Sequence, residues 1–239
     1  MKIDILHEDN EILVVNKPAG IPSQPDKNVL HEDNEILVVN KPAGIPSQPD
    51  KNGTPSLLEI LSENRPNLFL IHRLDQRVSG LIIFAKTESI AAELSKVFKS
   101  RNITKKYRAI VANKPIQEQG KLTHWLLKDT QKNLSKAFNK EVKNSQKAEL
   151  AYQLVQSSER YHLLDIELLT GRFHQIRSQL SSIGCPILGD LKYGYKRSLP
   201  DGSIFLQSYF LSFNHPKTNQ ALEFEIEIPE LWKKYGFTA

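Results

Sequence analysis

The sequence contains one cysteine, Cys185, among its 239 residues. A single cysteine cannot form a disulfide within the chain, so a disulfide-stabilised scaffold is excluded. We predict that Cys185 is a small buried apolar residue rather than a nucleophile. The sequence also has no apolar run close to the roughly 20 residues that span a membrane, and it begins without the apolar segment of a signal peptide. We therefore expect a cytoplasmic protein with no membrane partner.

Two kinds of cofactor site are missing from the sequence as well. No cluster of cysteine and histidine has the spacing of a metal site, and no glycine-rich loop has the pattern of a nucleotide-phosphate site. We expect neither a metal nor a small-molecule cofactor. Positive charge, in contrast, is in excess, with a net charge of +5 and a pI of about 9.1. Basic residues crowd residues 96–108 and 121–147, which favours a polyanionic partner and a phosphate-binding flank over a merely solvated face.

An internal repeat occupies the first fifth of the chain, where residues 6–28 and 30–52 are the same 23-residue sequence. Solenoid architectures need about three or more units, so two identical copies argue against one. A sheet has one place for the apolar strand of the repeat, at residues 36–39 in the second copy. We expect the second copy to be docked because it runs directly into the rest of the chain. Docking the first would add a long loop, at a modest closure entropy.

This repeat divides the chain into two parts. Residues 1–29 are predicted to be an extra copy that is disordered, packed on an edge strand or exchanged with a neighbouring molecule. Residues 30–239 are predicted to be a single domain. Because the two copies are identical, either Lys17 or Lys41 could stand in the native place of that lysine.

A short polar loop holds one aspartate, Asp75, between two arginines, Arg73 and Arg77. Apolar runs at residues 68–71 and 81–85 flank this loop and are typical of buried strands. A nearby arginine favours the charged form of an aspartate even where burial opposes it, and strands on both sides hold such a group rigidly. The pattern indicates a reactive carboxylate. The alternative is a solvated turn with surface ion pairs.

The rest of the chain alternates strands with a few helices. Thr54, Thr87 and Thr170 are predicted to cap helices at residues 55–61, 88–99 and 171–183. Strands are predicted at residues 36–39, 68–71, 81–85, 104–112, 148–155, 161–168, 204–213 and 221–228, and a last short helix at Pro229. The lysine-rich residues 113–148 are predicted to form a hairpin or a mobile insert. Together these elements predict an α+β fold built on a largely antiparallel mixed β-sheet with flanking helices.

In the third predicted helix, His174 and Arg177 are three residues apart and share a polar edge near the N-terminal end. They are candidates for a site, and for His174 a capping or surface role is the alternative.

Four segments resemble, in order and spacing, the RluA-type pseudouridine synthases. These segments are Asn-Lys-Pro-Ala-Gly at residues 40–44, His-Arg-Leu-Asp with Ser-Gly-Leu and Phe-Ala-Lys-Thr at 72–87, Lys-Tyr-Arg-Ala at 106–109, and Gly-Arg-Phe-His-Gln-Ile-Arg followed by Gly-Cys-Pro-Ile-Leu-Gly-Asp and Tyr-Gly at 171–194. The resemblance covers residues 30–239. It implies the pseudouridine synthase catalytic fold and an enzyme that isomerises specific uridines to pseudouridine in structured RNA, either rRNA or tRNA, by flipping the base out of its stack.

The resemblance also implies roles for single residues. Asp75 corresponds to the catalytic aspartate, Arg73 contacts RNA where the base leaves the stack, Tyr107 packs against that base, and Arg177 pairs with Asp75. Lys41 and His174 are assigned with them to substrate or RNA binding. One departure is Arg77, which stands where the family more often has proline or threonine.

These residues also suit the isomerisation of uridine when they are considered apart from the resemblance to the family. Moving a glycosidic bond from N1 to C5 of uracil needs no redox partner or metal, but it needs a carboxylate that attacks or removes a proton, a ring to stack on the flipped base, and cations for phosphates. RNA is thus the expected partner of a monomeric enzyme. Two alternatives stay open, namely a catalytically impaired RNA-binding protein of the same fold and a hydrolase with a carboxylate nucleophile.

Overall fold

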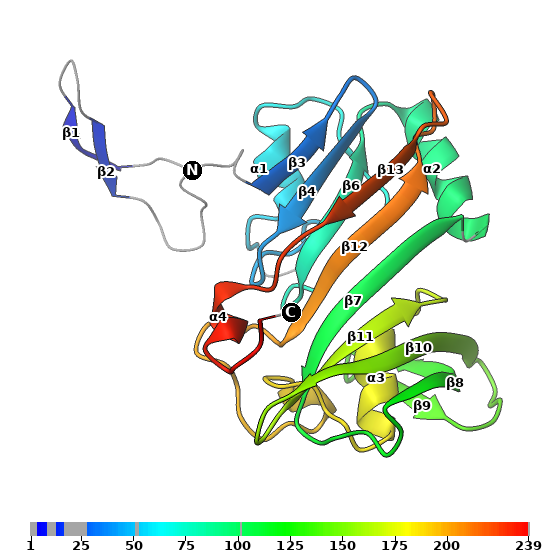
Figure 1. Ribbon diagram of the computed structural model, residues 1–239. Helices are drawn as coiled ribbons and strands as arrows, with labels where there is room; N and C mark the ends of the chain where they lie inside the picture. The colour runs from blue at the N-terminus through cyan, green and yellow to red at the C-terminus, as the bar shows by residue number, and fades with distance from the viewer. Residues whose placement is uncertain (1–3, 9–12, 17–27, 51–52, 101, 239) are drawn as a thin grey trace.

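The computed structural model describes residues 4–8, 13–16, 28–50, 53–100 and 102–238. Within these ranges, eleven strands form one large sheet and two more form a small sheet of their own (Figure 1). The strands of the large sheet are β3 (Val29–Glu32), β4 (Ile36–Lys41), β5 (Phe69–Leu70), β6 (Ser79–Ala85), β7 (Ile103–Val111), β8 (Gln119–Asp129), β9 (Leu134–Phe138), β10 (Gln146–Ser157), β11 (His162–Leu168), β12 (Leu206–Asn214) and β13 (Ala221–Glu225). The helices are α1 (Leu57–Ser62), α2 (Glu88–Ser100), α3 (Gln175–Ser182), α4 (Glu230–Lys233) and the 3-10 turn η2 (Leu191–Tyr193). None of the described helices is long and apolar enough to cross a membrane.

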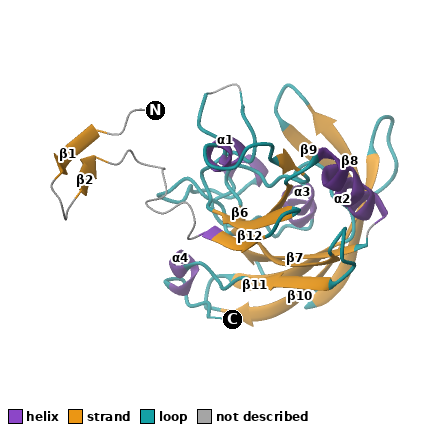
Figure 2. Ribbon diagram, turned by 90° about the horizontal axis from the view of Figure 1, so that it is seen from above, coloured by secondary structure: helices purple, strands orange, loops and turns teal. Residues whose placement is uncertain are grey.

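The large sheet is mixed but mostly antiparallel. Its strands follow the order β3-β4-β6-β12-β7-β11-β10-β8-β9, with β5 added on β6 and β13 on β12. The pairing of β6 with β12 is parallel, whereas the other pairings of this sheet are antiparallel. Figure 2 shows the pronounced curvature of the sheet. The predicted α+β fold on a largely antiparallel sheet is confirmed.

Gly80 lies where the parallel strands β6 and β12 meet, just after the loop that holds Asp75. Its φ is +122°, and a Cβ at this position would lie 2.2 Å from the Ser208 carbonyl oxygen on β12. Only glycine combines this backbone conformation with so close an approach. The Ser-Gly pair that closes the loop in the sequence therefore anchors the loop to the centre of the sheet.

The two copies of the repeat form the same hairpin. In the first, β1 (Asp4–Glu8) pairs with β2 (Leu13–Asn16); in the second, β3 pairs with β4, and the two registers are related by a shift of 24 residues. β4 of the second copy also pairs with β6, so it is the second copy that occupies the large sheet. The division of the chain at residue 29 stays a prediction.

β4 is buried on both faces, which accounts for its continuous apolar run. Leu37 and Val39 belong to one apolar cluster, and Ile36 and Val38 to another. Helices α1, α3 and α4 contribute to the first cluster, and α2 to the second. Cys185 is 1% exposed within the first cluster, as predicted for a structural cysteine.

Two predicted helix starts are wrong. Ser56, not Thr54, caps α1, because its hydroxyl accepts the Glu59 backbone N–H while the Glu59 carboxylate accepts the Ser56 N–H, a capping box. α3 begins only at Gln175, and the Thr170 hydroxyl donates to the Gln175 side chain (2.7 Å) instead of capping the helix. The Thr87 cap of α2 is confirmed by the bond from the Ile90 N–H to the threonine hydroxyl.

The lysine-rich stretch at residues 113–148 folds into the β8–β9 hairpin and the start of β10. Of the two predicted forms, the hairpin is confirmed. On β7, Ile110 is fully buried, as are its neighbours Ala109 and Val111. This strand lies in the middle of the sheet and is covered on both sides.

Candidate active site

The loop that carries Asp75 is bonded to the segment after β4 on both sides of the aspartate. Ahead of Asp75, the Ser47 hydroxyl donates to the Leu74 carbonyl (2.8 Å) and accepts the Leu74 N–H (3.1 Å). Behind it, the Gly44 N–H donates to the Gln76 carbonyl (2.7 Å), and the Gln76 side chain donates to the Gly44 carbonyl (3.0 Å). These bonds fix the backbone around Asp75 and leave its side chain at the surface of a cavity.

Lys41 supports the same loop from inside the protein. Its side chain is fully buried, and its Nζ donates to the carbonyls of Pro42 and Ile45 (both 2.8 Å) and of Gln76 (3.3 Å). Burial lowers the pKa of Lys41 to about 7, while Asp75 acts in the opposite direction. All three donors of the ammonium are used within the protein. In this structure Lys41 fixes the loop next to Asp75, and its assignment to substrate or RNA binding stays a prediction.

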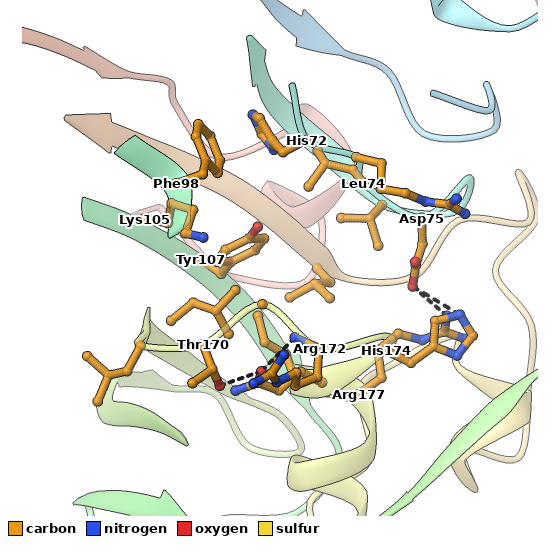
Figure 3. Close-up of a pocket in the computed structure, with 18 of the residues that line it drawn as sticks. His72, Leu74, Asp75, Phe98, Lys105, Tyr107, Thr170, Arg172, His174 and Arg177 are labelled. Carbon is orange, nitrogen blue, oxygen red and sulfur yellow. Dashed lines mark hydrogen bonds and ion pairs between the residues drawn. The ribbon is translucent and has the colours of Figure 1, made fainter. Parts of the chain in front are cut away.

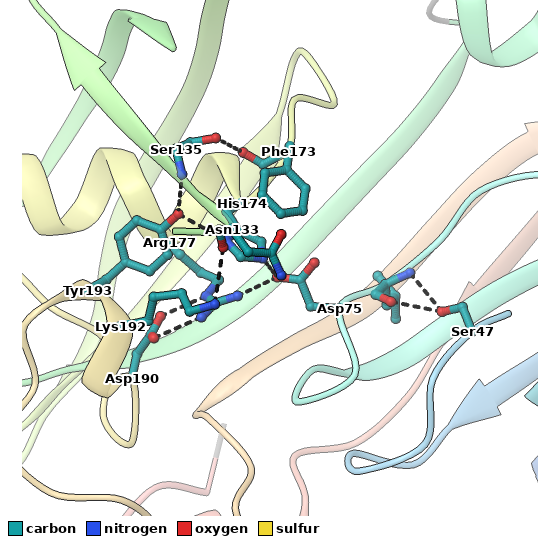
Figure 4. Close-up of polar contacts among 11 residues, drawn as sticks. Ser47, Asp75, Asn133, Ser135, Phe173, His174, Arg177, Asp190, Lys192 and Tyr193 are labelled. Atoms are coloured by element: carbon teal, nitrogen blue, oxygen red, sulfur yellow. Dashed lines mark hydrogen bonds and ion pairs between the residues drawn. The ribbon is translucent and has the colours of Figure 1, made fainter. Parts of the chain in front are cut away.

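Arg177 joins Asp75 to a second carboxylate, as Figure 4 shows. Its Nη1 donates to Asp75 Oδ2 (2.7 Å), while Nε and Nη2 donate to the two oxygens of Asp190 (2.7 and 2.9 Å). Arg177 is 5% exposed and Asp190 is fully buried. Burial opposes the charged guanidinium, but the bonds to Asp190 and the charge of Asp75 outweigh it and raise the pKa of Arg177. The predicted pairing of Arg177 with Asp75 is present as a single bond, while the two-bond fork of the guanidinium goes to Asp190.

His174 also faces Asp75. It occupies the left-handed conformation (φ +50°) immediately before α3, and its Nε2 lies 3.4 Å from Asp75 Oδ2. Its Nδ1 lies 2.9 Å from the Tyr193 hydroxyl, which accepts the Ser135 N–H. Burial lowers the pKa of His174 to about 4 and raises that of Tyr193 to about 12, so both are neutral at pH 7. The Tyr193 O–H can then donate to His174 Nδ1. The proton of the neutral imidazole therefore lies on Nε2, which faces Asp75.

A cavity of about 570 Å³ opens beside the carboxylate of Asp75 (Figure 3). Tyr107 projects into it from β7, opposite Asp75, and is 7% exposed. Burial raises the pKa of Tyr107 to about 12, and the charge of Asp75 acts in the same direction, so the phenol stays neutral. Apolar residues such as Leu74 and Ile176 share the lining with several cationic side chains, and Asp75 is the one carboxylate among the residues that line this cavity.

One wall of this cavity is aromatic with a cation at its edge. His72 and Phe98 stack with centroids 4.9 Å apart, and the Lys105 ammonium lies 5.2 Å from the Phe98 centroid. Burial lowers the pKa of His72 to about 3 and also lowers the pKa of Lys105. His72 is thus neutral and accepts the Ile83 N–H (3.2 Å). Lys105 places a cation at the edge of the wall, where a phosphate could bind.

The two arginines that flank Asp75 lie at the surface. Arg73 lines the first cavity and also a second one on the other side of Asp75, whereas Arg77 lines only the second of these. Arg73 is exposed, as an RNA contact requires. Arg77 is exposed too, and its carbonyl accepts the Ile204 N–H (3.1 Å), which fixes its backbone while its guanidinium remains at the rim.

The structure thus brings Asp75, Arg177 and His174 into contact and places Tyr107 and Arg73 on the same cavity. The sequence prediction missed Asp190, which binds Arg177, and Tyr193, which orients His174. Both lie in the turn-rich segment after α3, and no local periodicity connects such a turn to a helix. The Gly-Asp and Tyr-Gly pairs within the motif at residues 171–194 were the available signal.

Residues 35–182 match the family described as RNA pseudouridylate synthase, a span that includes β4, Asp75, Tyr107 and Arg177. The chain belongs to the RNA pseudouridylate synthase family. It is 34% identical over 238 residues to an uncharacterized RNA pseudouridine synthase of Mycoplasma pneumoniae, covering 95% of this chain and 67% of that protein. It is 30% identical to the ribosomal large subunit pseudouridine synthase C of Rickettsia prowazekii, covering 94% and 68% of the two chains.

A solved structure has the same fold. Human RNA pseudouridylate synthase domain containing 4 aligns with a TM-score of 0.71 over 87% of this chain and 91% of that chain, at 24% identity. The RluA-type resemblance seen in the motifs is confirmed, and the protein is an RNA pseudouridine synthase, an isomerase.

Proposed function

We propose that this pseudouridine synthase flips a uridine of structured RNA into the cavity between Asp75 and Tyr107 and isomerises it with Asp75 as the catalytic residue. The observation that carries the proposal is the two-carboxylate fork of Arg177, which holds Asp75 by a 2.7 Å bond at the edge of that cavity. A carboxylate oriented in this way needs no reorganisation before it reacts. In the reaction, the bond from C1′ to N1 breaks, a bond from C1′ to C5 forms, N1 gains a proton and C5 loses one.

The other residues of the cavity have supporting parts in this proposal. Tyr107 packs on the flipped uracil as a neutral phenol, and Arg73 occupies the space that the base leaves in the RNA. Arg177 and His174 hold the Asp75 carboxylate, and Lys105 and Arg73 meet the phosphates beside the flipped nucleotide. Asp75 can attack the substrate as a nucleophile or remove a proton from it, and both roles use the same geometry.

Ribosomal RNA is the first candidate for the substrate. Relatives named ribosomal large subunit pseudouridine synthase C and D share 30% of their aligned residues with this chain. We therefore place the target uridine in large-subunit rRNA, with tRNA as the second candidate. A monomeric state and a cytoplasmic location stay predictions from the sequence.

Mapping pseudouridines in total RNA from cells with and without this gene tests the proposal. We expect one or a few sites to disappear from rRNA when the gene is removed, and to return with the wild-type gene but not with the Asp75→Asn gene. If sites disappear only from tRNA, the substrate is tRNA and not rRNA. No change at all, together with salt-sensitive binding of RNA by the purified protein, would favour the catalytically impaired RNA-binding protein instead.

A further inference from the structure

Asp75 lies between two cavities. The first is the one assigned above to the flipped uridine. The second, of about 780 Å³, lies on the other side of the Asp75 loop and shares five residues with the first, namely Arg73, Leu74, Asp75, His174 and Arg177. Its own lining includes Phe173 and Leu191. A single flipped base occupies one of these two spaces, so the second is open to another part of the substrate.

Phe173 offers a flat aromatic surface in the second cavity. One face of its ring stacks on His174, with centroids 3.8 Å apart and an interplanar angle of 20°. The Phe173 carbonyl accepts the Ser135 hydroxyl (2.6 Å), and His174 is itself held by Tyr193. The ring is therefore fixed from behind although it is only half-buried. A rigid, partly exposed ring is the usual platform on which proteins stack an unpaired base.

One surface lysine covers the face of the Phe173 ring that does not contact His174. The Lys128 Nζ lies 4.6 Å from the ring centroid, and because His174 takes one face, the ammonium lies over the other. Lys128 is exposed, and an exposed cation–π contact contributes only about 0.5–1 kcal/mol. A base can displace this lysine at little cost. The released ammonium would then lie within reach of a phosphate next to that base.

The rest of the second cavity matches a nucleotide better than an apolar ligand. Leu191 is 49% exposed there, and next to it Lys192 Nζ donates to the Asn133 carbonyl (3.1 Å). Arg73 and Arg77 stand at the rim, and the carboxylates in the lining are those of Asp75 and Asp50. An apolar floor with several cations around it combines stacking with phosphate contacts, as in sites for single-stranded RNA.

We propose that the second cavity binds the base of the nucleotide next to the target uridine, stacked on Phe173. This inference rests on the proposed function, since it assumes that the uridine itself takes the first cavity. The two bases then lie on opposite sides of the Asp75 loop, and the backbone between them passes Arg73 and Arg77. Every base has a flat face, so the site selects an unpaired neighbour rather than one base type. The enzyme thus requires two adjacent unstacked nucleotides, not one.

A merely structural role of Phe173 is the competing explanation. In that case the ring only keeps His174 against Asp75, and its removal would lower the affinity for every RNA hairpin to the same extent. The two explanations differ in whether the effect of Phe173 depends on the neighbouring base, which a double-mutant cycle between protein and RNA measures.

The experiment uses the full chain and an RNA hairpin with pseudouridine in the target position, which the enzyme cannot convert further. The seven-nucleotide loop carries adenosines on both sides of the pseudouridine, and two matched hairpins replace the 5′ or the 3′ neighbour by an abasic residue. Dissociation constants are measured for the wild type, Phe173→Ala and Phe173→Leu. Phe210→Ala is the matched control, because Phe210 also has a lysine over its ring (Lys106, 5.0 Å) but lines neither cavity.

We expect Phe173→Ala to bind the intact hairpin roughly 5- to 100-fold more weakly than the wild type, the range of one lost base stack. Phe173→Leu, which keeps the apolar volume, should lose most of the same affinity. With one of the two abasic hairpins, the wild type and Phe173→Ala should bind within about twofold of each other. Phe210→Ala should bind like the wild type.

If Phe173→Ala lowers the affinity for all three hairpins by the same factor, the stacking site is overturned. Wild-type affinity of Phe173→Leu for the intact hairpin would also overturn it. Turnover of the matching uridine hairpin by the wild type separates the two proposals. Turnover without base-dependent coupling contradicts the second site alone, whereas coupling without turnover contradicts the proposed catalysis and leaves the second site supported.

Discussion

Arg177 bridges Asp75 and Asp190, two carboxylates that lie 115 residues apart in the sequence and share one buried guanidinium. Asp190 takes two of the three bonds, and Asp75 takes the third. Asp190 is fully buried, whereas the Asp75 side chain is 23% exposed at the cavity. The buried carboxylate therefore fixes the direction of the guanidinium, and the guanidinium in turn fixes the carboxylate that reacts.

Asp190→Asn tests this arrangement. The amide cannot hold both guanidinium nitrogens as a charged acceptor, so Arg177 loses its orientation while Asp75 remains. We expect kcat to fall about 10- to 100-fold with a small change in KM, and the free energy of unfolding to fall by about 2–4 kcal/mol. Asp165→Asn is the control, because that carboxylate pairs with Arg108 away from the cavity and is 36% exposed. Equal kcat in Asp190→Asn and wild type would contradict the bridging role.

Lys41→Met tests the loop support beneath Asp75. The substitution removes the ammonium that donates to the carbonyls of Pro42, Ile45 and Gln76, and we expect it to lower the free energy of unfolding by roughly 2–4 kcal/mol. The kcat should fall because the Gln76 carbonyl then keeps only the Gly44 N–H as a donor, which loosens the loop beside Asp75, while RNA affinity stays close to that of the wild type. Lys96→Met, at a side chain that is 75% exposed, serves as the control for loss of charge. A variant that lost RNA affinity but kept its stability would show that Lys41 is an RNA contact.

The buried histidine beside Asp75 makes stability depend on pH. The pKa of His174 is lowered to about 4, below the ordinary value of 6.5, so between these values the unfolded chain binds a proton that the folded chain does not. Stability is lost as the pH falls from about 6.5 to about 4, by about 3 kcal/mol from this group. Urea unfolding of His174→Gln at pH 7 and pH 4.5 should show a smaller loss than the wild type. An identical pH dependence in both proteins would contradict a buried neutral His174.

Much of the fold follows from local pattern, because β4 and β6 are apolar runs between turn residues and α2 has one apolar face behind a threonine cap. The start of α3 does not, since Thr170 is a good cap in isolation but its hydroxyl is used by Gln175 in the folded chain. Lys41 shows the same limit. A lysine before a proline is normally solvated, and only the packing of two distant loops makes it an internal donor. The pairing of Arg177 with Asp75, across 102 residues, was expected from the family motifs and not from spacing.

Removing one copy of the repeat tests the predicted division of the chain. Deletion of residues 6–29 joins Ile5 to Leu30 and leaves a single copy in which Ile5 takes the place of Val29 at the start of the β3–β4 hairpin. Because β4 of the second copy pairs with β6, we expect the shortened chain to keep its melting temperature within about 3 °C and to keep kcat. Loss of folding would show that the first copy belongs to the domain.

The central claim is that Asp75 carries out the isomerisation. Forming the bond from C1′ to C5 releases the hydrogen of C5, so an RNA transcript labelled with tritium at C5 of uridine reports turnover as tritium in water. The most direct measurement compares Asp75→Asn with Asp165→Asn, a carboxylate that lines neither cavity, on the large-subunit rRNA transcript. We predict no tritium release by Asp75→Asn with RNA affinity within a few-fold of the wild type, and turnover by Asp165→Asn. Tritium release by Asp75→Asn at the wild-type rate would contradict the claim.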